Sequence, residues 1–268
     1  METGRTADRR LHRVLLATDR SAASRAALLA VAGLAAGGGT EVVVLHVSDR
    51  GRPEEGERLA GEIACGLLAL AVNARSELRR ARPGGVAAEI AAAAREHSSD
   101  LVVLGSRGRF DLGGLLPGSV SREVVERVSC PVLKVRAGRR AAGRRRRVLL
   151  AMAGDEDVGD LVLVTAAIAD RDARVLVLLV RAPGDRDLEL TRSEGLVERV
   201  VVGLRRCGVR SRGRVGAAAH ETAEEIARDA LGYGADLVVM GSRRLPAQTA
   251  MLIAALREGD STQEEGRR

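Results

Sequence analysis

Three apolar segments of this chain occur twice, and the two occurrences lie 133 to 136 residues apart. The matched segments begin, in the first and second occurrence, at Arg13 and Arg147, at Glu41 and Arg174, and at Asp100 and Asp236. In both copies, short apolar runs typical of buried strands alternate with helical patterns, which favours a parallel sheet covered on both faces. A chain of 268 residues has room for two domains of ordinary size. The repeat therefore predicts two tandem α/β domains.

The repeat also sets the expected domain boundaries. We expect a first domain at residues 9–137, a linker at 138–146 that is polar and rich in Gly and Arg, and a second domain at 147–258. Residues 247–257 have a helical pattern, so we expect no fifth strand in the second domain and an uncovered edge beside its fourth strand.

Local patterns predict the elements of the first domain. Helices are expected over 21–34, 58–74 and 86–97, with Ser21 or Ser24 as the cap of the first one. A weakly patterned strand is expected between residues 76 and 82, at an edge of the sheet.

A glycine-rich loop follows the apolar run that ends at Leu104, and it precedes a helical stripe that starts at Val120. Such a loop joins the carboxyl end of a strand to a helix, which is where α/β folds bind nucleotides. Gly105 and Gly108 carry no side chain that would keep a phosphate from backbone N–H groups. The Gly118-Ser119 pair opens the helix, whose free N–H groups favour an anion. The loop is therefore interpreted as a phosphate-binding loop, with a plain flexible connection as the alternative.

The loop has the spacing G-x2-G-x9-G-S, which resembles the ATP-binding signature of the universal stress protein family. Three further segments carry the resemblance: a first strand that ends in Ala17-Thr18-Asp19, a second that ends in Leu-His-Val at Val47, and a closing strand that starts at Cys130-Pro131. The resemblance covers roughly the first half of the chain. It implies two doubly wound, Rossmann-like domains with strand order 3-2-1-4-5, of the adenine nucleotide α-hydrolase-like class, with the second one degenerate.

The resemblance also implies one ATP site, which can include Mg²⁺ held mostly by the phosphates. For Asp19, contact with adenine or ribose competes with a simpler role in capping the helix at Ser21. The implied binding residues are, near the base, Ala17, Asp19 and Val47; beside the ribose and phosphate, Leu104 and Gly105; and around the triphosphate, Gly108, Gly118, Ser119 and Val120.

The second copy departs from this pattern where ATP binding would matter. Ala153 occupies the position of Asp19, Arg244 replaces the second glycine of the loop, and no Gly-Ser pair follows. We therefore expect a domain that binds no nucleotide.

The net charge of +7 raises the alternative of a basic nucleic-acid-associated protein. Phe110 and Tyr233 are the only aromatic residues, so the stacking platforms of single-strand binders are missing. Lys134 is the only lysine, and a positive charge supplied almost wholly by arginine suggests a coding bias.

An ATP-consuming enzyme on a related fold is the other alternative, although the sequence contains no P-loop, no catalytic constellation and no metal-ligand spacing.

The expected function is therefore an ATP-binding module for stress response or signalling, which at most hydrolyses ATP very slowly and acts on an unknown protein partner. The start of the chain is polar, and three widely spaced cysteines suggest buried, reduced thiols, so a cytoplasmic location is expected without membrane association. If the closing strand at residues 132–135 is an open edge, it predicts a homodimer.

Overall fold

The computed structural model describes most of the chain. The described residues are 11–19, 21–49, 53–106, 120–136, 146–152, 158–181, 187–217, 222–241 and 250–254.

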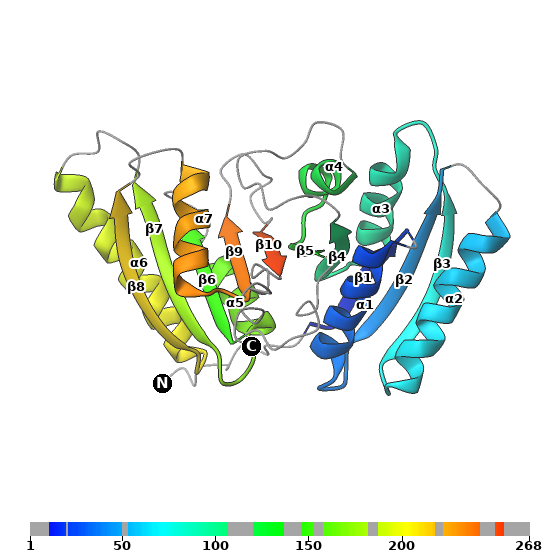
Figure 1. The fold of residues 1–268 in the computed structure, drawn as a ribbon, viewed down its shortest axis with the longest axis horizontal. Helices are drawn as coiled ribbons and strands as arrows, with labels where there is room; N and C mark the ends of the chain where they lie inside the picture. Colours follow the sequence, from blue (N-terminus) through cyan, green and yellow to red (C-terminus); the bar gives the residue numbers. More distant parts are fainter. Residues whose placement is uncertain are drawn as a thin grey trace, which may run out of the picture.

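The described strands form one ten-stranded sheet with the order β3-β2-β1-β4-β5-β10-β9-β6-β7-β8 (Figure 1). Strands β1 to β5 form a parallel sheet in the first half of the chain, and β6 to β9 form a second parallel sheet. The two sheets have the orders 3-2-1-4-5 and 3-2-1-4, as expected for tandem doubly wound domains. The strands are β1 (Arg13–Thr18), β2 (Glu41–Ser48), β3 (Asn73–Arg80), β4 (Leu101–Ser106), β5 (Val132–Arg136), β6 (Arg147–Met152), β7 (Arg174–Arg181), β8 (Arg210–Ala217), β9 (Leu237–Gly241) and β10 (Ala250–Ala254).

Helices cover both faces of the sheet. One apolar core joins α1, α2, α5 and α6 to one face and runs through both halves of the chain. The other face packs against α3 and α4 in the first half and against α7 in the second (Figure 1). The helices are α1 (Ala22–Ala35), α2 (Pro53–Ala69), α3 (Gly85–Glu96), α4 (Val120–Arg127), α5 (Val158–Ile168), α6 (Asp187–Arg206) and α7 (Thr222–Tyr233).

The inner strands of both sheets are apolar on both faces. Leu15, Leu16, Leu149 and Leu150 are fully buried, because helices cover the strands from either side. The edge strand β3 begins at Asn73, three residues earlier than expected, since it pairs along the whole length of β2. The second helix likewise lies earlier, over Pro53–Ala69.

Strand β10 corrects two expectations about the second half. The helix expected over 247–257 is wrong at its centre, because Ala250–Ala254 is a strand. The edge of β9 is not uncovered, because β10 pairs with it in antiparallel orientation. The same strand pairs in parallel with β5. A short apolar segment between two sheet edges gains hydrogen bonds as a strand that a helix would not supply to those edges. The second parallel sheet itself has four strands, as expected.

The pairing of β10 with β5 also removes the open edge on which the homodimer was based. In Figure 1, β10 lies between β5 and β9, so a second copy would have to displace it to reach β5. The homodimer stays a prediction without that support. The domain boundaries at 137 and 146 also stay predictions, since residues 137–145, which include all but the last residue of the expected linker, lie outside the described residues.

None of the helices described here is long and apolar enough to cross a membrane. The cysteines are free, but the expectation that all three are buried is wrong, because Cys65 is exposed on α2. Burial raises the pKa of the Cys130 thiol to about 11, which keeps it protonated at neutral pH.

Candidate functional site

The carboxyl ends of β1, β2 and β4 meet at one edge of the first sheet. Ala17 in β1 lies in register with Leu45 in β2 and with Leu104 in β4. The chain leaves β1 toward β2 on one side and reaches β4 on the other, so the strand order reverses between β1 and β4. Open α/β sheets bind ligands at such a reversal. Asp19 directly follows β1, Val47 lies at the end of β2, and Gly105 follows Leu104 in β4. Five of the expected site residues therefore lie at this edge: Ala17, Asp19, Val47, Leu104 and Gly105.

The apolar members of this group lie on one face of the sheet. Ala17 and Val47 are partly buried and pack against the core formed with α3 and α4, to which Leu104 also belongs. Leu104 is 4% exposed, so it packs in the core beneath Ala17 and Val47 and has little surface that a ligand could contact. Ala17 and Val47 remain accessible enough to contact a planar apolar ligand.

Asp19 organises the start of α1. Its Oδ1 atom accepts a hydrogen bond from the Ser24 hydroxyl at 2.6 Å and one from the Ser21 backbone N–H at 3.1 Å. The Asp19 N–H donates in turn to the Ser24 Oγ atom at 3.0 Å. The cap of α1 is Ser21, whose side chain accepts from the Ser24 N–H. Asp19 therefore helps to hold the start of α1 in place. Its carboxylate is also exposed, so contact with a ligand is a further role that it can have.

Gly105 has a packing role that the sequence did not suggest. It lies within β4 rather than in a loop, in register with Val135 of β5. A Cβ atom at this position would lie 2.5 Å from the backbone carbon of Ala23 and 2.6 Å from the backbone nitrogen of Ser24. The missing side chain makes room for the first turn of α1, and through it for the Asp19 network.

Sequence reasoning missed Thr18 and the contact between His46 and Gly56. The Thr18 side chain is 6% exposed, and its hydroxyl has no hydrogen-bond partner among the described residues. The Thr18 carbonyl lies 3.0 Å from Nδ1 of His46. A Cβ at Gly56 would lie 2.2 Å from the His46 ring, so this glycine of α2 makes room for the imidazole. A polar residue at the end of an apolar strand was the available signal for Thr18.

The residues expected around the triphosphate fall mostly outside the described part of the chain. Gly108, Gly118 and Ser119 all lie there, together with the loop between β4 and α4. Val120 is the first residue of α4 and is 42% exposed. The structure thus describes the five residues expected near the base and ribose, and their role in binding, like that of the residues expected around the phosphates, stays a prediction.

In the second half, β6 and β9 repeat the geometry of β1 and β4, with Ala151 in register with Met240. The departures at Ala153 and Arg244 lie outside the described residues. Within the described ranges, no three His, Cys, Asp or Glu side chains are grouped so that they could hold a metal ion.

Comparisons with known proteins address the first half and the fold. Residues 10–136 match the model of the Universal stress protein family. A universal stress protein from Archaeoglobus fulgidus is 18% identical, with 92% of this chain and 97% of that chain covered and a TM-score of 0.68. A functionally unknown protein, PA1789 from Pseudomonas aeruginosa, is 13% identical, with coverages of 93% and 94% and a TM-score of 0.61.

A Universal Stress Protein Family protein from Arabidopsis thaliana, solved with AMP bound, is 18% identical over 48% of this chain and 93% of that chain, with a TM-score of 0.37. No protein with a curated description matches the chain. At these identities the likenesses to the Archaeoglobus and Pseudomonas structures establish the fold alone.

Proposed function

Because residues 10–136 match the model of the Universal stress protein family, we propose that the chain is an ATP-binding stress-response or signalling module that works through its first domain. The observation that carries the proposal is the meeting of Ala17, Asp19 and Val47 at the reversal of strand order between β1 and β4. The second domain is a degenerate relative that binds no nucleotide at its carboxyl edge. The chain is not an enzyme beyond very slow hydrolysis of ATP, and its nucleotide state alters contacts with a protein partner.

The described residues fit the base and ribose of a nucleotide. Ala17 and Val47 offer partly exposed apolar surface for a planar base. Asp19 offers an exposed carboxylate, which accepts hydrogen bonds from an amino group or a hydroxyl. Gly108, Gly118, Ser119 and Val120 would hold the phosphates, and Mg²⁺ would be held mainly by the phosphates themselves.

Asp19→Ala is expected to weaken ATP binding by about 1–3 kcal/mol, because a polar contact to the ligand is lost. The variant also loses the bonds of Asp19 to Ser21 and Ser24, so its stability falls as well. Isothermal titration calorimetry well below the unfolding temperature measures the affinity.

The matched control is Ser21→Ala, which removes the cap of α1 and leaves Asp19 in place. We expect it to lower stability by about 0.5–2 kcal/mol with little change in ATP affinity. An ATP affinity that stays at the wild-type value in Asp19→Ala would restrict Asp19 to its structural role.

We also expect one nucleotide per chain at the carboxyl edges of the sheets. The second copy lacks the aspartate and the Gly-Ser pair of the first, so nothing there is placed to hold the phosphates. Calorimetric stoichiometry with ATP checks this expectation. Two equivalent sites per chain would contradict it.

A further inference from the structure

A cavity of about 740 Å³ lies in the second half of the chain, at the amino ends of β6, β7 and β8 and beside the end of α7. It is far along the strands from the carboxyl edge at which that domain would hold a nucleotide. Its charged lining consists of five arginines and one carboxylate: Arg147, Arg174, Arg210, Arg212, Arg214 and Asp229.

Three of these arginines form a row across neighbouring strands. Arg147 is in register with Arg174, and Arg174 is in register with Arg210. Neighbouring strands lie about 4.8 Å apart, and paired residues of parallel strands share a face. Arg212 and Arg214 follow on the same face of β8, in register with Leu176 and Leu178 of the core under α7. Like charges set side by side repel each other, so this row favours a bound anion.

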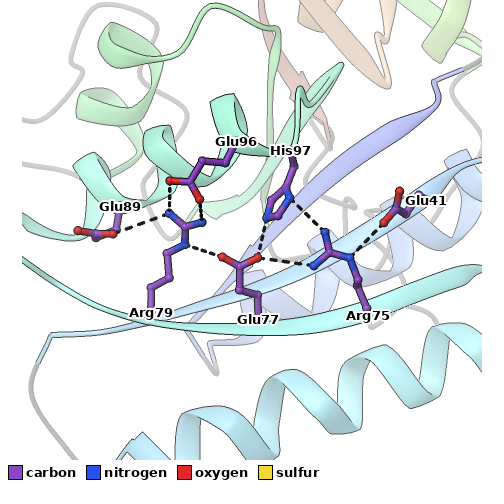
Figure 2. A network of polar contacts seen from close by, with 7 residues as sticks. All are labelled: Glu41, Arg75, Glu77, Arg79, Glu89, Glu96 and His97. Carbon is purple, nitrogen blue, oxygen red and sulfur yellow. Dashed lines mark hydrogen bonds and ion pairs between the residues drawn. The ribbon is translucent and has the colours of Figure 1, made fainter.

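In the first half of the chain, the equivalent region of β2, β3 and α3 contains a network of ion pairs, which Figure 2 shows. Glu41 pairs in register with Asn73 there, just as Arg174 pairs with Arg210 in the second half. The same register matches Arg75 with Arg212 and Glu77 with Arg214. The two copies thus carry opposite charges at two equivalent positions. Glu41 corresponds to Arg174, and Glu77 corresponds to Arg214.

In that network every arginine meets a carboxylate (Figure 2). The Nε atom of Arg75 lies 3.1 Å from Glu41, and the Nε atom of Arg79 lies 2.5 Å from Glu77. Arg79 also bonds to Glu96. Burial raises the pKa of Glu77, but the hydrogen bonds and charges of Arg79 and His97 outweigh it and hold that pKa below its ordinary value. The first copy therefore neutralises its own arginines.

The second copy does not neutralise its arginines in this way. Asp229 pairs with Arg214. The side chains of Arg174, Arg210 and Arg212 make no hydrogen bond or ion pair with the described residues, and all three are exposed. The carboxylates that pair with Arg75 in the first copy, Glu41 and Glu77, are replaced here by arginines.

Tyr233 builds one wall of the cavity. Guanidinium groups of Arg147 and Arg212 lie 5.8 and 5.9 Å from the centre of its ring. Its hydroxyl donates to the Arg174 carbonyl at 2.9 Å, and the Arg147 Nη1 atom donates to the Tyr233 carbonyl at 3.0 Å. The ring and the backbone thus hold arginines of two strands in place before any ligand arrives.

We propose that this arginine cavity binds a small anion that carries two or more phosphate groups, in a site separate from the nucleotide site of the first domain. Guanidinium groups bind phosphate oxygens in a bidentate way and remain charged at every physiological pH. The volume lies in the range of small-molecule sites. The arginines converge on one hollow, which suits a compact anion better than an extended nucleic-acid backbone.

The test uses the full chain and tripolyphosphate as the probe, by titration calorimetry at about 0.15 M ionic strength, where charges more than about 8 Å apart at the surface are largely screened. The variant Arg174→Glu/Arg210→Asn installs the residues that the first copy has at the matching positions, Glu41 and Asn73. It keeps the backbone bond of Tyr233 to residue 174, and both positions are exposed, so folding is retained. We expect one tripolyphosphate per wild-type chain and an affinity loss on the order of tenfold or more in the variant, since charged hydrogen bonds are removed.

The matched control is Arg199→Glu/Arg206→Asn, which makes the same charge change on exposed positions of α6, on the opposite face of the sheet. We expect it to bind tripolyphosphate within about twofold of wild type, because remote exposed charges are screened. Absence of binding to the wild type would overturn the proposal, and so would an equal loss in both double variants.

Two further arms identify the source of the phosphates. In a Gly118→Val background, ATP that displaces tripolyphosphate supports the phosphate chain of a nucleotide as the ligand, and a lack of displacement supports a free polyphosphate. A single-stranded oligonucleotide that binds more tightly than tripolyphosphate, and loses its affinity in Arg174→Glu/Arg210→Asn, would overturn the proposal in favour of nucleic acid.

Discussion

Gly105→Ala is expected to destabilise the protein by about 3 kcal/mol, the upper end of the range that overpacking typically costs. The added Cβ would lie 2.5 and 2.6 Å from backbone atoms of Ala23 and Ser24. Backbone atoms cannot rotate away as the end of a side chain can, so the first turn of α1 must move. That turn carries the hydroxyl that Asp19 binds, so ATP affinity should fall together with stability. Urea unfolding followed by circular dichroism measures the loss.

Gly61→Ala is the matched control for this change. Gly61 lies within α2, and a Cβ there would meet nothing within 4 Å. Alanine favours a helix over glycine by about 0.8–1 kcal/mol, so this variant should be more stable than wild type. If Gly105→Ala unfolds at the same urea concentration as Gly61→Ala, the close approach of α1 to β4 does not exclude a side chain at position 105, and this prediction is wrong.

Gly118→Val is expected to abolish ATP binding while the protein stays folded. In the proposed site, Gly118 lies where the triphosphate approaches the backbone, and a branched side chain would occupy that space and strain the turn. In the Arg174→Glu/Arg210→Asn background, which removes the arginine cavity as a second ATP site, calorimetry should detect no heat of binding at ATP concentrations that saturate the same background with Gly118 intact. Thermal unfolding, measured on the same preparation, should show a transition close to that of wild type.

Gly37→Val controls for the substitution itself. Gly37 follows α1 and precedes β2, at the opposite end of the first sheet from the proposed site, and a Cβ there would meet nothing within 4 Å. We expect it to bind ATP as wild type does. An ATP affinity that Gly118→Val leaves intact, in a folded protein, would remove the loop between β4 and α4 from the site.

The sequence by itself determined the elements whose signals are local. Apolar runs such as the one that ends at Leu104 predict buried strands, because both faces of a parallel sheet are covered. The cap of α1 at Ser21 was readable as one of two serines, since capping depends on a few neighbouring residues. The repeat predicted that the two halves of the chain have largely the same fold. The two parallel sheets confirm this prediction.

Only the tertiary structure decided the features that depend on partners distant in sequence. Residues 250–254 have a helical composition, yet they form β10 because two sheet edges offer hydrogen bonds on either side. Gly105 resembles a loop glycine in sequence, while its role depends on how closely α1 approaches β4.

The arginines at the starts of β6, β7 and β8 are 27 and 36 residues apart along the chain, and only strand register sets Arg147, Arg174 and Arg210 side by side. Local patterns report backbone preference and burial, whereas register, close packing and the meeting of charges are properties of the folded sheet.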